Sequence, residues 1–253
     1  MVRKLLKHEF LYYIRTIGLF IPWVLLLGVV ARLFGELHST NSATSVIYIL
    51  TVLAATTCAS ILTVAATAVG VLRFYKNLFT AEGYLTLTLP VKHSQHIFVK
   101  TVGFVVTSAV CALVSNLTLY IAGAGLSYNI SWPDGASMTH KAFWSVELVL
   151  VLIALAVAAP MLFYACIAVG QTAKKNRIVK AIFTYFGFSF AIYAFVIIAI
   201  IFFAAIIDGT GALSGQYGAI HGILIFILLV TLLLCFVFCR ITLKVMRKKL
   251  NLE

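Results

Sequence analysis

Charged side chains are scarce in this chain, and acidic ones are the scarcest. Only 10% of the 253 residues are Asp, Glu, Lys or Arg, and seven of them are acidic. A soluble domain carries roughly 25% charged residues. Hydrophobic residues make up 63% of the chain, and the mean hydropathy is +1.10. Because lipid cannot hydrate charges, this deficit excludes an ordinary soluble domain and indicates a protein of the bilayer.

Motifs that carry catalysis or hold phosphates are also missing from the sequence. It contains no G-x-x-x-x-G-K-[ST] loop, and none of its six His residues falls in an H-E-x-x-H pattern. The five Cys residues all lie in apolar runs, where packing is the simplest interpretation, and they imply no disulfide framework. We therefore expect a chain that is not itself an enzyme and that holds no metal and no cofactor.

The sequence has instead a series of long apolar runs. Six runs reach the roughly 20 residues that a helix needs to cross a ~30 Å hydrocarbon core, and none shows the alternation of a barrel strand. We expect an all-α polytopic membrane protein that forms one domain over residues 1–253. Its six transmembrane helices are expected at residues 17–34, 46–71, 97–122, 146–169, 181–207 and 220–240.

The basic residues orient these spans. Of the 19 Lys and Arg residues, all except Arg32 and Lys141 fall in segments that six spans place on one side of the membrane. Short basic loops stay in the cytoplasm, so the N- and C-termini are both expected there. The net charge of +12 lies at span ends, which favours anionic lipid headgroups as partners and not nucleic acid.

Residues 1–16, "MVRKLLKHEFLYYIRT", precede the first span. Apolar side chains recur there at helical spacing, with basic residues between them. This pattern predicts an N-terminal amphipathic helix that lies in the interface of the inner leaflet.

Few polar residues lie inside the predicted spans. The clearest group is Ser115, Asn116 and Thr118, for which two interpretations stay open: hydrogen bonds between packed helices, or a substrate path. Glu147 lies at the outer start of the fourth span, where a structural role at a helix N-terminus is the simpler interpretation. His93 and His96 are expected at a solvated or headgroup-level position.

The longest predicted cytoplasmic connection is residues 73–100, "RFYKNLFTAEGYLTLTLPVKHSQHIFVK". Phe74, Tyr75 and Phe79 continue the helical spacing of the second span, and Pro90 stops regular pairing. Aromatic and leucine side chains at a basic surface can rest among headgroups, or they can dock a cytoplasmic protein. In the docking interpretation the apolar anchors include Phe79, and Glu82 adds a charged contact.

Within this connection, "FYKNLFTAEGYLTLTLPV" resembles the second cytoplasmic segment of ABC exporter permeases of the type-2 membrane family. The resemblance covers this run alone, and the rest of the chain agrees in pattern. In that family the segment forms the coupling helix that binds a groove of a separate ATPase. The resemblance thus places ATPase docking on the following residues of the run: Phe79, Glu82, Tyr84, Leu85 and Pro90.

The resemblance also implies an assembly and an activity. The chain would be a permease subunit in the plasma membrane of a bacterium, paired with a second copy or a paralogue. Two ATPase subunits would bind Mg-ATP and drive export of a peptide, lipid or amphipathic compound. Short re-entrant helices between the fifth and sixth spans, frequent in the family, would have to come from the end of residues 181–207.

Two other classes are weighed against this one. An ion-coupled secondary transporter is the alternative, but the predicted spans lack buried acids and no inverted repeat is visible. An intramembrane enzyme ranks last, because no acid pair, zinc-ligand cluster or Ser–His dyad appears at helical spacing.

Overall fold

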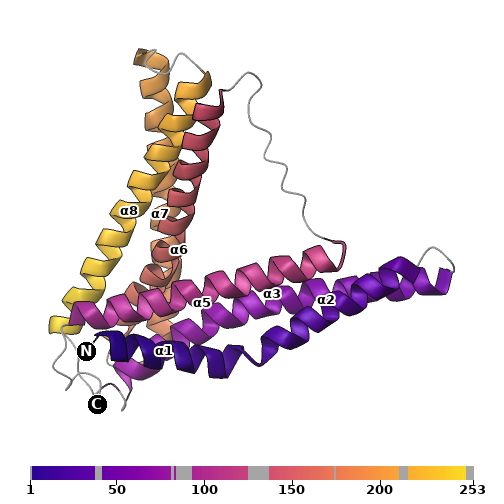
Figure 1. Cartoon of the computed structure of the whole chain (residues 1–253). Helices are drawn as coiled ribbons and strands as arrows, with labels where there is room; N and C mark the ends of the chain where they lie inside the picture. The colour runs from indigo at the N-terminus through magenta and orange to yellow at the C-terminus, as the bar shows by residue number, and fades with distance from the viewer. Residues whose placement is uncertain are drawn as a thin grey trace. The chain divides into compact units, whose positions relative to one another are not determined.

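The computed structural model describes residues 2–37, 42–80, 83, 93–124, 137–173, 175–210 and 216–248. Within these residues the chain forms helices and no strands. The helices are α1 (Val2–Ile17), α2 (Phe20–Leu37), α3 (Ser42–Phe79), α5 (His93–Ile121), α6 (Met138–Gly170), α7 (Arg177–Thr210) and α8 (Gln216–Lys248) (Figure 1). All except α1 are long and apolar enough to cross a membrane. The predicted all-α class and the six membrane-length helices are confirmed.

Most helices extend beyond the predicted spans at one or both ends, whereas α2 begins only at Phe20. α3 continues to Phe79, as the spacing of its aromatic residues predicts, and α5 already begins at His93. α7 runs without a break from Arg177 to Thr210. The end of residues 181–207 therefore forms no separate re-entrant helix, because this proline-free apolar run continues one helix.

The chain divides into two compact units, Met1–Asn129 and Ile130–Glu253, which are called unit 1 and unit 2 below. Unit 1 contains α1, α2, α3 and α5, and unit 2 contains α6, α7 and α8. Each unit is described by itself, and the expected single permease domain stays a prediction.

In unit 1, α2, α3 and α5 pack against one another and α1 packs mainly on α5. Small residues of α3 make this packing close, since Ala55, Ala59 and Ala66 are at most 3% exposed. A Cβ atom built at Gly70 would lie 2.2 Å from the Phe104 ring of α5, so only glycine fits there. Close approach between apolar helices is how membrane bundles gain van der Waals contact.

In unit 2, α6 packs against both α7 and α8. Trp144 and Tyr164 of α6 are fully buried. Between the three helices lies an apolar cavity of about 480 Å³, to which Leu155, Ile192 and Phe226 each contribute from a different helix. Of the six membrane-length helices, α7 has the smallest share of buried residues, and its exposed phenylalanine and isoleucine side chains suit contact with lipid.

Candidate functional site

A buried carboxylate lies where α3 ends and α5 begins. Glu9 of α1 is 3% exposed and accepts hydrogen bonds from two cations. Nζ of Lys100 lies 2.9 Å from its Oε1 atom, and Nε of Arg73 donates to its Oε2 atom. Glu9, Arg73 and Lys100, called the Glu9 cluster below, tie α1, α3 and α5 together.

Local sequence explains why each member points inward. Glu9 shares a helical face with Tyr13 and Ile17, which are also buried. Arg73 lies near the end of α3, where its guanidinium group is 3.6 Å from the Tyr12 ring centroid. This cation–π contact holds the Arg73 side chain while it donates to Glu9.

The charges of the Glu9 cluster fix the ionisation of its carboxyl group. Burial by itself would raise the pKa of Glu9, but the charges and hydrogen bonds of Lys100 and Arg73 outweigh it and hold that pKa below its usual range. Burial and the neighbouring Glu9 charge raise the pKa of Tyr13 well above its ordinary value. The cluster is therefore ionised at neutral pH, with one anion between two cations.

Apolar packing surrounds the same end of α3. Phe74 and Leu78 are fully buried, and the rings of Phe74 and Phe79 meet edge to face with centroids 5.8 Å apart. Phe79, which the sequence assigned to docking, is 8% exposed and so is covered within unit 1. The other residues assigned to docking lie outside the described residues, and their role stays a prediction: Glu82, Tyr84, Leu85 and Pro90.

The start of α5 differs from the sequence expectation. His96 is 2% exposed, so a solvated position is wrong for this side chain, and a position at the level of the headgroups stays a prediction. Because α5 begins at His93, residue 96 faces the interior one helical turn before Lys100. Among the described residues, Nε2 of His96 and Nδ1 of His93 have no hydrogen-bond partner.

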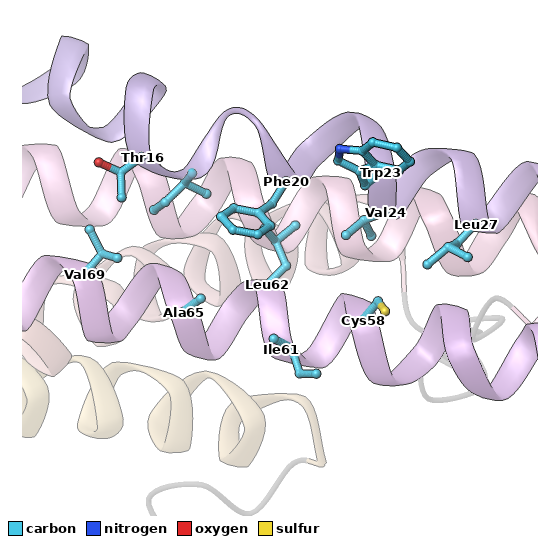
Figure 2. A pocket seen from close by; sticks show the side chains of 11 residues that line it. Thr16, Phe20, Trp23, Val24, Leu27, Cys58, Ile61, Leu62, Ala65 and Val69 are labelled. Carbon is cyan, nitrogen blue, oxygen red and sulfur yellow. The ribbon is translucent and has the colours of Figure 1, made fainter.

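An apolar groove of about 280 Å³ lies at the junction of α1 and α2, next to α3 (Figure 2). Phe20 and Trp23 of α2 and Cys58 and Ile61 of α3 line it, and Thr16 supplies a hydroxyl group at one end. Apart from the Thr16 hydroxyl and the indole N–H of Trp23, the lining is almost wholly hydrocarbon, so the chemistry of the groove suits an apolar chain.

The three polar residues of α5 have separate surroundings. Ser115 donates a hydrogen bond to the carbonyl oxygen of Ala59 at 3.0 Å and so joins α5 to α3. Asn116 is exposed and its amide donates to the Ala112 carbonyl of its own helix. Thr118 is buried and donates to the Val114 carbonyl. Ser115 thus makes a bond between packed helices, and the substrate-path role of these residues stays a prediction.

Unit 2 contains a polar cluster that sequence reasoning did not find. Nδ1 of His221 lies 2.9 Å from both carboxylate oxygens of Glu147, and Nε2 of His221 lies 3.4 Å from Nδ1 of His140. His140, Glu147 and His221 are called the His221 cluster below, and the rings of its two histidines pack against the ring of Trp144. The spacing of His140, Trp144 and Glu147 on one face of α6 was a readable signal, but their partner on α8 lies 74 residues beyond Glu147.

Comparison of the chain with protein-family models, with curated proteins and with solved structures finds no match.

Proposed function

We propose that this chain is the membrane-spanning permease subunit of an ATP-driven ABC exporter of a bacterial plasma membrane. A separate ATPase subunit, present in two copies, binds Mg-ATP. A second permease copy or a paralogue completes the pathway. The cargo is a peptide, a lipid or an amphipathic compound, because a transport pathway between these helices would be lined by apolar side chains.

The Glu9 cluster is the observation that carries this proposal. A coupling segment must transmit force to the membrane helices, so the helices on its two sides must be held firmly. Here α3 and α5 flank the segment 80–92, and one buried carboxylate joins both of them to α1. The proposal of an ATPase as the partner comes from the resemblance of this segment to a coupling helix.

The central experiment is isolation of the protein from its native membrane. Any co-purifying subunit is identified by mass spectrometry and tested for phosphate-binding loops and ATP hydrolysis. The double variant Tyr84→Ala/Leu85→Ala is expected to lose the ATPase and transport, because each anchor contributes roughly 1.5–3 kcal/mol on burial. Glu82→Gln is expected to weaken coupling less, since an exposed ion pair contributes only about 0–1 kcal/mol.

A matched control tests whether removal of any tyrosine and leucine has this effect. Leu113 and Tyr120 of α5 are 71% and 77% exposed, so Leu113→Ala/Tyr120→Ala removes the same side chains away from the segment. The control should retain the ATPase and its stimulation. If the Tyr84/Leu85 variant also retains both, or if the wild type binds no ATPase and the segment only contacts headgroups, the docking role is wrong. The chain purified without its partner should hydrolyse no ATP.

The topology has its own test. Both termini are proposed to be cytoplasmic, which places residue 214 on the opposite side. A cysteine introduced by Ser214→Cys, in a variant without the five native cysteines, should react with an impermeant reagent only from outside. Reaction only from the cytoplasmic side would overturn the orientation.

The second candidate function is proton-coupled transport, and the His221 cluster is the observation that favours it. A chain of hydrogen bonds between a carboxylate and two imidazoles on membrane-length helices is the kind of group that can relay protons. Transport in proteoliposomes separates the two functions. An exporter of the proposed class needs ATP and continues after the proton gradient is collapsed, whereas a proton-coupled carrier stops.

A further inference from the structure

One exposed side of α8 changes from apolar to basic along its length. Six exposed side chains recur there at intervals of three or four residues, which places them on one face of the helix: Leu229, Leu233, Phe236, Arg240, Lys244 and Arg247. The first three are apolar and the last three are cations. This row is called the α8 stripe below. Phe238 and Thr242, on the other side of the helix, are buried.

A cation–π contact joins the apolar and the basic part of the α8 stripe. The guanidinium carbon of Arg240 lies 5.2 Å from the centroid of the Phe236 ring. Arg240, Lys244 and Arg247 line a recess of about 300 Å³ together with Leu243. Three cations that donate hydrogen bonds therefore border one recess at the basic end of the stripe.

The carboxylates of the described part of unit 2 lie far from this recess. They belong to Glu147 and Asp208. Glu147 contacts His221 near the start of α8, whereas the recess lies near the end of that helix. Asp208 lies near the end of α7, and α7 begins beside the end of α6. The basic end of the α8 stripe is therefore not neutralised by an acid of these helices.

The Glu9 cluster shows how the chain compensates cations that it uses for its own packing. Arg73 and Lys100 share one buried carboxylate. Within the described residues, no ion pair involves Lys244 or Arg247. These two exposed cations are therefore available to an anion from outside the chain.

We propose that the α8 stripe binds one anionic phospholipid. The phosphate group lies among Arg240, Lys244 and Arg247, and one acyl chain lies along Phe236, Leu233 and Leu229. The order of the two parts fits such a lipid, because cations that follow a membrane-length apolar run lie at the level of the headgroups. A free phosphate ion or an acidic protein surface would use the cations and leave the apolar part of the stripe without a role.

This proposal requires that α8 spans the membrane, and it does not depend on the transport function. It is tested on the full-length protein in detergent, by native mass spectrometry with phosphatidylglycerol and phosphatidylcholine of the same acyl chains. One phosphatidylglycerol should bind in preference to phosphatidylcholine and raise the midpoint of thermal unfolding. Inorganic phosphate at the same concentration should do neither. The proposal is wrong if both lipids bind equally, or if inorganic phosphate displaces the lipid.

Substitution of the cations tests the headgroup site. Each Lys or Arg near an anionic surface contributes a factor of roughly five in affinity. Lys244→Gln is therefore expected to weaken phosphatidylglycerol binding about fivefold, and Arg240→Gln/Lys244→Gln/Arg247→Gln about 100-fold. The matched control, Arg3→Gln/Lys4→Gln/Arg15→Gln, removes the same three charges from exposed positions of α1. An equal loss in this control would show that net charge attracts the lipid, and the assigned site would be wrong.

Substitution of an aromatic residue tests the acyl-chain part. Phe236→Ala keeps the three cations but removes the ring beneath Arg240, so it should also weaken phosphatidylglycerol binding. Phe190→Ala removes an exposed phenylalanine of α7 and should bind as the wild type does. All substituted side chains are exposed, and circular dichroism and gel filtration establish folding for each variant. Wild-type affinity in folded Phe236→Ala would contradict the proposal.

Discussion

The Glu9 cluster of unit 1 and the His221 cluster of unit 2 contain the same parts, one carboxylate and two nitrogen bases. In the first, the bases are Lys100 and Arg73, which are 6% and 14% exposed and carry permanent charge at neutral pH. In the second, the bases are imidazoles, and the side chains of His221 and Glu147 are 23% and 20% exposed, against 5% for that of Glu9. The first cluster is thus suited to hold helices together, whereas the second is more open to solvent.

The helices around the two clusters also differ in how closely they pack. Unit 1 packs four helices closely, and its cluster joins three of them. Unit 2 places α7 and α8 against α6 with an apolar cavity between the three helices. Unit 1 therefore has the close packing that the proposed coupling role requires, whereas unit 2 contains an apolar cavity between its helices.

The largest effect is expected from Glu9→Gln. This change removes the charge that compensates the buried Lys100 and the partly buried Arg73. Loss of one partner from a buried ion pair typically costs about 3–5 kcal/mol. Thermal unfolding in detergent should show a large fall in the midpoint. Glu36→Gln is the control, because Glu36 pairs with Arg32 on the surface and should have little effect. Equal effects of the two substitutions would contradict the structural role of Glu9.

The acid dependence of stability should change with the same substitution. The pKa of Glu9 is lower in the folded chain than its ordinary value of 4.5. The ionised carboxylate therefore stabilises the fold fully above about that pH, and this stabilisation is lost as the pH falls through the lower folded pKa. Unfolding midpoints measured from pH 7 downward should converge for wild type and Glu9→Gln in acid. A constant difference at every pH would show that Glu9 does not ionise as described.

Substitution of glycine by alanine tests the difference in packing between the units. Gly70→Ala places a methyl group against the buried Phe104 ring, and overpacking of this kind typically costs about 1–3 kcal/mol. Gly187→Ala is the matched change in α7, where a Cβ atom meets nothing within 4 Å. It should raise stability by roughly 0.5–1 kcal/mol through helix propensity. The midpoint of thermal unfolding should fall for Gly70→Ala and rise for Gly187→Ala. A change in the same direction for both would remove this distinction between the units.

Sequence reasoning succeeded where the signal is local. An apolar run long enough to cross a membrane predicts a helix by itself, and aromatic residues at helical spacing predicted the extension of α3 to Phe79. The predicted helix at residues 1–16 was also found, as Val2–Ile17. Its interfacial placement stays a prediction.

Both clusters were missed because their members are far apart along the chain. Glu9 and Lys100 are separated by 91 residues, and His140 and His221 by 81. Only tertiary packing brings such pairs together, and no spacing rule covers it. Each cluster still left a local signal. In α6 it is the shared face of His140, Trp144 and Glu147. In α1, Glu9 is the lone acid and falls on the same face as Tyr13 and Ile17, where a carboxylate needs a cationic partner.

A small loss of stability is expected from Glu147→Gln, the same change as at Glu9 in the other cluster. The amide oxygen that this substitution introduces can still accept the hydrogen bond of His221, and the partly exposed site remains hydrated. The loss should therefore be near the net contribution of one hydrogen bond, about 0.5–1.5 kcal/mol. Thermal unfolding measures this loss of stability. The double variant His221→Ala/Glu147→Gln, compared with the two single variants in a double-mutant cycle, shows how much of the loss comes from the interaction between the two side chains. A loss as large as that of Glu9→Gln would mean that the His221 cluster also holds helices together. The distinction between a cluster that holds helices and one that is more open to solvent would then be wrong.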